Sequence, residues 1–100
     1  MKNIEERTKL ANELAESIKQ FERAIVIRDA MSDLVRKHLK KIDEQYLQEY
    51  EPIETGEIVE LSKIAHTYND VIGQVAVAFE RRTKAGNAWN ELVEEEKEEQ

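Results

Sequence analysis

The sequence predicts an all-α protein, a long antiparallel hairpin of two helices. Apolar residues recur at intervals of three and four along both halves of the chain, which is the spacing of one helix face. The 100 residues include three Gly and one Pro, and residues 1–51 contain neither. Pro52 and Gly56 lie close together in the middle of the chain, which predicts one turn at residues 51–55.

The first helix is expected over about residues 3–50. With Ile4 as heptad position a, the seam positions a and d are mostly apolar, although Arg28 and Ser32 interrupt them. The a positions are Ile4, Ala11, Ile18, Ile25, Ser32, Leu39 and Tyr46, and the d positions are Arg7, Leu14, Phe21, Arg28, Val35, Ile42 and Glu49. Between residues 24 and 34 further apolar residues lie off the seam, and they need a second surface to cover them.

The second helix is expected over about residues 56–97. With Ile58 as a, the a positions are Ile58, Ala65, Ile72, Phe79, Gly86 and Val93, and the d positions are Leu61, Tyr68, Val75, Arg82, Trp89 and Glu96. The position before each a is also mostly apolar, so the face is broader than a two-stranded seam and suits a bundle. The heptad phase continues through Gly86, which favours one continuous or gently kinked helix over a break at 86–87 and a third helix.

Charge supports antiparallel pairing. Residues 1–50 carry ten basic and ten acidic side chains, whereas residues 51–100 carry five and twelve, so the whole net charge of −7 lies in the second half. With the turn centred on Ile53, the acidic end at 94–100 should lie beside Lys2, Arg7 and Lys9. Arg82 should then come level with Glu22, Ile25 and Asp29.

Two helices cannot enclose an interior, so each would bury only the strip that faces the other. Leaving several aliphatic side chains in water forfeits several kcal/mol at about 25 cal/mol per Å². We therefore expect the single domain, residues 1–100, to dimerise into a four-helix bundle. The alternative is a monomer folded back as three helices.

Two groups of residues are candidates for interaction. Arg28, Ser32 and Arg82 are expected to form a polar layer that sets register and orientation in the oligomer. The candidate oligomerisation residues are Ile25, Ile27, Arg28, Met31, Leu34, Val71, Phe79, Arg82 and Trp89. A candidate basic docking patch for an acidic partner or a phosphate backbone consists of Arg36, Lys37, Lys40 and Lys41.

Composition excludes several other classes of protein. The absence of Cys excludes disulfide scaffolds and thiol catalysis. The longest apolar runs, 24–27 and 75–79, are far too short to span a membrane, and the first residues lack a signal-peptide core, so a cytoplasmic protein is expected. The acidic balance argues against direct binding of nucleic acid.

Catalysis and metal binding have weak support. No nucleophile motif or Gly-rich phosphate loop occurs. His38, His66 and Asp70 offer two imidazoles and a carboxylate, but surface histidines explain them better, and no cofactor or metal is expected. A metal-dependent helical hydrolase is therefore the remote alternative.

The sequence thus predicts a non-enzymatic coiled-coil module for protein–protein interaction and oligomerisation, such as an adaptor, assembly or accessory protein. Its expected partners are itself and another protein. The alternative function is an acidic inhibitor, of the phage or mobile-element type, that blocks the nucleic-acid-binding surface of a partner complex. The acidic side chains of the second half favour that alternative.

Overall fold

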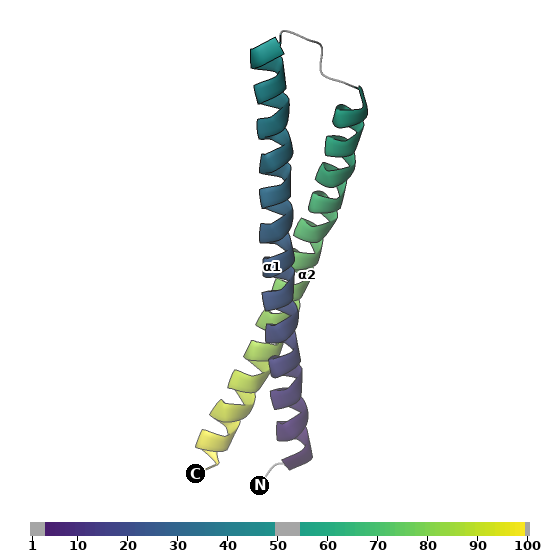
Figure 1. Ribbon diagram of the computed structural model, residues 1–100. Helices are drawn as coiled ribbons and strands as arrows, with labels where there is room; N and C mark the ends of the chain where they lie inside the picture. Colours follow the sequence, from purple (N-terminus) through teal and green to yellow (C-terminus); the bar gives the residue numbers. More distant parts are fainter. Residues whose placement is uncertain (1–3, 50–54, 100) are drawn as a thin grey trace. The chain divides into compact units, whose positions relative to one another are not determined.

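The computed structural model describes residues 4–49 and 55–99, and the side chains of residues 4–44 and 56–99. These residues form two long helices, α1 (Ile4–Glu49) and α2 (Thr55–Glu98), shown in Figure 1. No strand occurs in the described ranges. The predicted all-helical hairpin is confirmed, and the helices end within two residues of the expected positions. The predicted turn lies outside the described residues, apart from Thr55, which begins α2.

The contacts gather into two compact units. Unit 1 comprises Met1–Ala24 and Gln74–Gln100, and unit 2 comprises Ile25–Gly73. Each unit therefore pairs a part of α1 with a part of α2. The expectation that residues 1–100 behave as one domain stays a prediction.

Helix α2 continues through Gly86 and Asn87 without interruption. The alternative of a break and a third helix at this point is wrong. An interior Gly costs a helix only about 1 kcal/mol relative to Ala, whereas a break would leave several backbone groups without partners and would shift the heptad phase. The charges at two helix ends also suit the helix dipole, because Glu5 and Glu6 lie in the first turn of α1 and Lys97 lies in the last turn of α2.

The core of each unit is centred on heptad position g, the position before each a. In unit 1 the buried side chains are Ser17, Ala24, Ala78, Ala85 and Leu92, and in unit 2 they are Ile42, Ile64 and Val71. All of these are g positions except Ile42, which is a d position. The g residues of unit 1 are mostly small, and small side chains let two helix backbones approach closely. The seam therefore lies between g and d, not between d and a.

This shift of the seam corrects one expectation. Phe79 occupies an a position, which the heptad assignment places on the seam, yet 55% of it is exposed. Among the described side chains, four other large residues at a positions are also exposed: Ile4, Leu39, Ile58 and Ile72. Around a helix the order of positions is c, g, d, a, so a seam at g and d leaves the a positions on its flank.

Neither helix contains, within the described residues, a stretch long and apolar enough to cross a bilayer.

Candidate interaction surface

The two edges of unit 1 differ in chemistry. On one edge, here called the c edge, the c positions of both helices meet in a polar network. On the other, the a edge, d positions meet and the a positions lie beyond them. The seam of small side chains separates the two edges.

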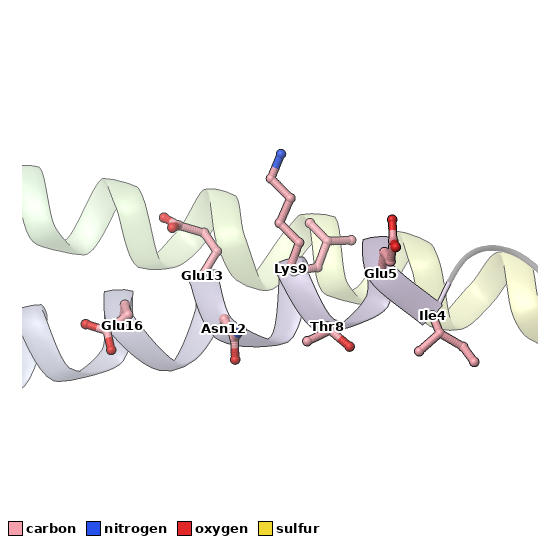
Figure 2. A pocket seen from close by; sticks show the side chains of 8 residues that line it. Ile4, Glu5, Thr8, Lys9, Asn12, Glu13 and Glu16 are labelled. Atoms are coloured by element: carbon pink, nitrogen blue, oxygen red, sulfur yellow. The ribbon is translucent and has the colours of Figure 1, made fainter.

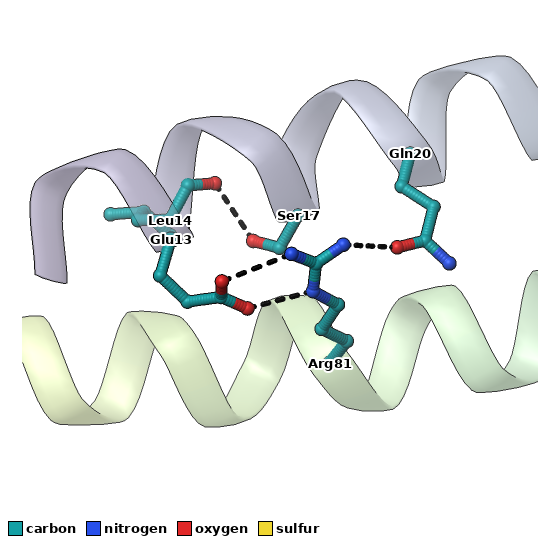
Figure 3. Close-up of polar contacts among 5 residues, drawn as sticks. All are labelled: Glu13, Leu14, Ser17, Gln20 and Arg81. Atoms are coloured by element: carbon teal, nitrogen blue, oxygen red, sulfur yellow. Dashed lines mark hydrogen bonds and ion pairs between the residues drawn. The ribbon is translucent and has the colours of Figure 1, made fainter. Parts of the chain in front are cut away.

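Arg81 organises the c edge of unit 1. Its Nε and Nη2 donate hydrogen bonds to Oε1 and Oε2 of Glu13 at 2.7 and 3.0 Å, and its Nη1 donates to the side-chain oxygen of Gln20. Figure 3 shows the guanidinium reaching from α2 to both residues of α1. A bidentate pair of this kind is geometrically specific, so it selects one pairing of these two helix segments.

Electrostatics at this pair follow from the hydrogen bonds. The hydrogen bonds from Arg81, and secondarily its charge, lower the pKa of the Glu13 carboxyl below its ordinary value of 4.5. The Glu13 carboxylate in turn raises the pKa of the Arg81 guanidinium. Ser17, buried nearby, donates its hydroxyl to the carbonyl oxygen of Leu14 at 2.7 Å, so it brings no unpaired polar group into the seam.

The a edge of unit 1 is lined mainly by aromatic and aliphatic side chains. The rings of Phe21 and Phe79 lie 5.7 Å apart between centroids, and the Arg82 guanidinium lies 5.3 Å above the Phe21 ring. Towards the end of the unit, Arg7 and Glu96 form an ion pair at 3.7 Å. The charged groups of this edge therefore have partners within the chain.

These contacts test the predicted register. The Arg7–Glu96 pair confirms that the acidic end lies beside Arg7. Arg82 was expected to lie opposite Glu22, Ile25 and Asp29. It contacts Phe21 instead, so the actual register differs from the predicted one by about one helical turn. An error of this size arises because the predicted pairing of residues depends directly on the assumed position and length of the turn.

In unit 2 both edges carry exposed apolar side chains. Lys41 and Glu57 form an ion pair at 3.6 Å on the c edge. The same edge presents Ile27 and Leu34, which are exposed c positions of α1, whereas the c positions of α2 here, Glu60 and Thr67, are polar. The a edge presents exposed apolar residues from both helices, namely Leu39, Ile58 and Ile72.

The predicted interaction residues fall into different environments. Ile27, Leu34 and Phe79 are exposed large apolar side chains, and Arg82 is also exposed. Ile25, Arg28, Met31 and Trp89 are half-buried. Val71 belongs to the core of unit 2 and does not reach the surface. Arg28 pairs with its neighbour Asp29 at 3.1 Å.

The predicted basic patch is partly neutralised within the chain. Arg36 lies 3.9 Å from Asp33, Lys40 lies 4.0 Å from Glu44, and Lys41 pairs with Glu57. Because these exposed pairs are weak, the basic side chains can exchange them for carboxylates of a partner.

Two further features concern the binding of ligands and metal ions. A shallow hollow of about 770 Å³ on unit 1 is lined by α1 alone, so nothing encloses a ligand (Figure 2); its residues are Ile4, Glu5, Thr8, Lys9, Leu10, Asn12, Glu13 and Glu16. Over the described residues, no group of three or more His, Cys, Asp or Glu side chains is placed to hold a metal ion. His38 is half-buried and His66 is exposed.

Sequence reasoning missed Glu13, Gln20 and Arg81. Their signal was present, since all three are c positions with complementary polar groups. This complementarity can be recognised in the sequence only when the register and the g-centred seam are known. Comparison of the chain with protein-family models, with curated proteins and with solved structures finds no significant match in any of the three.

Proposed function

We propose that this protein is a non-enzymatic, cytoplasmic helical module that acts through contacts with itself and with another protein. One observation carries the proposal: large apolar side chains stand exposed along ordered helices. They are Ile4, Val26, Ile27, Leu34, Leu39, Ile58, Val59, Ile72, Val77 and Phe79. Exposed apolar side chains that share one face, as Leu39, Ile58 and Ile72 do on the a edge of unit 2, are typical of interaction sites.

Self-association is the first part of the proposal, with two hairpins forming a four-helix bundle. The core supports it, because Ala24, Ala78 and Ala85 are three of the seven buried hydrophobic residues among the side chains that the structure describes. Buried Ala contributes little apolar area, so the hairpin alone lacks the burial that a stable domain needs. A second hairpin supplies the missing contacts.

Docking of another protein is the second part. On α1, Ile27 and Leu34 are exposed at c positions, and Lys41 of the basic patch is the next c position along the helix. Apolar residues seven apart, followed by basic residues, suit an amphipathic partner helix with an acidic end.

Photo-crosslinking in the native cell tests this function. A photoreactive phenylalanine analogue at Ile27 should give adducts of one or a few discrete sizes, while the same analogue at Glu22, an exposed polar position of α1, should not. Equal yields at both positions, or no adduct at Ile27, would argue against a protein-interaction role for this surface.

A second candidate function rests on the acidic face of α2. Exposed carboxylates of Glu91, Glu94 and Glu98 lie around a shallow hollow of about 460 Å³ that also includes Asn87 and Asn90. Such a face suits an inhibitor that covers a nucleic-acid-binding surface. Binding to a basic partner should then weaken steeply with salt and be competed by DNA or RNA, and a salt-insensitive complex would exclude this mode.

A further inference from the structure

Resting on the proposed function, we infer that the a edge of each unit is covered by the a edge of a second copy of this chain. The partner is thereby identified as the chain itself, and the contact surface as the flank formed by the a and d positions. The c edge remains outside this contact.

The accessible surface of the chain supports a partner as large as a second copy. The chain exposes 7937 Å² of accessible surface, whereas a compact monomer of 11.7 kDa exposes about 5,900 Å². The difference of about 2,000 Å² is in the range that each subunit of an obligate homodimer buries. A short peptide or a small ligand would cover only a fraction of it.

The choice of edge follows from which helices contribute apolar side chains. A four-helix bundle requires both helices of a hairpin to face the other hairpin. In unit 1 the c edge is closed by Arg81, Glu13 and Gln20, and in unit 2 only α1 places large apolar residues there. The a edge carries large apolar residues from both helices in both units: Ile4, Ile18, Phe79 and Val93 in unit 1, and Ile25, Leu39, Ile58 and Ile72 in unit 2.

Charge on this edge also suits a second copy. Arg7 is paired with Glu96, Arg28 with Asp29, and Arg82 lies over Phe21. Because these groups are satisfied within the chain, the edge requires no partner of opposite charge. A face that would repel its own copy would carry an unpaired charge of one sign.

The a positions of the two helices also share one order of side-chain size. Over the first six a positions of α1 and the six of α2 the order is large, small, large, large, small, large; these are Ile4, Ala11, Ile18, Ile25, Ser32 and Leu39 in α1, and Ile58, Ala65, Ile72, Phe79, Gly86 and Val93 in α2. The small residues leave gaps, here called notches, between the bulky side chains of the a edge. At Gly86 the notch is open, since an added Cβ would meet no atom within 4 Å. Alternating large and small positions allow two such faces to interdigitate.

The test compares charged substitutions on and off the a edge by size-exclusion chromatography with light scattering. Ile72→Glu and Phe79→Glu lie on the edge, and 42% and 55% of these residues are exposed. The controls, Val26→Glu and Val77→Glu, lie at b and f positions and are 67% and 62% exposed. We expect the edge variants to raise the dimer dissociation constant about 100-fold or more, because each buries a carboxylate at the contact, and the controls to change it less than about threefold.

A second pair of variants covers the case in which the charged variants lose helicity. Gly73 and Gly86 are both interior glycines of α2 with open space at Cβ, but Gly86 is an a position and Gly73 a b position. Leu at either position should raise helicity. Only Gly86→Leu should weaken dimerisation, about tenfold or more, because it fills the notch.

Several outcomes overturn the inference. A wild-type chain that stays monomeric excludes the second copy, while the crosslinking at Ile27 still tests docking of another protein. A dimer that resists Ile72→Glu and Phe79→Glu excludes the a edge but leaves self-association standing. Loss of the dimer in Val77→Glu would instead place the copy on the c edge, where Val77 lines a hollow with Leu10 and Ala88.

Discussion

Arg81 is the residue through which the c edge of unit 1 is held. Its two hydrogen bonds to Glu13 and its bond to Gln20 connect the two helices across side chains that are only partly exposed. The pair is close to solvent, so its main effect is on register and its contribution to net stability is small. The seam of Ser17, Ala78 and Ala85 beside it has no comparable directionality.

The Glu13–Arg81 pair makes stability depend on pH in a defined direction. Because the pKa of Glu13 is lowered in the folded chain, the pair stabilises fully above the unfolded value of 4.5, and this contribution is lost as the pH falls through the lowered pKa. Glu13→Gln should therefore lower the melting temperature at pH 7, and the difference from wild type should shrink in acid. Circular dichroism melts at several pH values measure this, with the exposed Glu22→Gln as control. An equal difference at pH 7 and in strong acid would show that the ion pair is not the cause.

At the scale of the helices, the burial of small g residues in unit 1 determines which heptad positions lie in the seam and which lie on its two edges. Ala78 is fully buried, whereas Ala76, two residues earlier in α2, is exposed. Ala78→Leu should destabilise by about 1–3 kcal/mol because three extra carbons must enter a filled seam. Ala76→Leu should change stability by less than about 0.5 kcal/mol. Urea unfolding of the two variants measures the difference, and equal effects would contradict a g-centred seam.

Helix α2 also contains a glycine whose replacement should be favourable. Gly73 is exposed, lies in the helix interior, and has no atom within 4 Å of an added Cβ. Gly73→Ala should stabilise by about 0.5–1 kcal/mol through helix propensity and the entropy of the unfolded chain. Gly56→Ala, in the first turn, should give a smaller gain. Thermal melts at one fixed protein concentration would show it, and an unchanged or lower melting temperature for Gly73→Ala would indicate a contact at that position.

The period of apolar residues was sufficient to predict both helices and nearly all of their ends, because Pro52 and Gly56 are the only breakers near the middle. It was not sufficient to place the seam. Hydrophobicity favours Phe79 as a core residue. Small side chains allow two helices to pack closely, however, and for that reason Ala78 lies in the seam while Phe79 lies beside it. The Glu13–Arg81 pair could not be predicted because it depends on the register of the two helices. An approximate length for the connection at residues 51–55 fixes that register only to within about one helical turn.

At the scale of the whole molecule, Arg82 tests whether polar seam residues specify the assembly. Its guanidinium lies over Phe21 at a d position, an interaction worth about 0.5–1 kcal/mol at an exposed site. Arg82→Leu should keep or raise stability, since Leu adds apolar area to the a edge, but should broaden the distribution of oligomers. Native mass spectrometry would reveal the broadening. A variant that simply unfolds, or one that forms a single species identical to wild type, would contradict a specifying role for Arg82.

The area that the chain leaves exposed remains the strongest reason to expect a second copy. Sedimentation equilibrium of the unmodified chain at micromolar concentrations tests this directly. If a second copy covers the a edge, the measured mass should be twice 11.7 kDa and should fall towards 11.7 kDa on dilution. Phe79→Glu should also lower the mass, whereas Val77→Glu should not. A mass of 11.7 kDa at every concentration would contradict it.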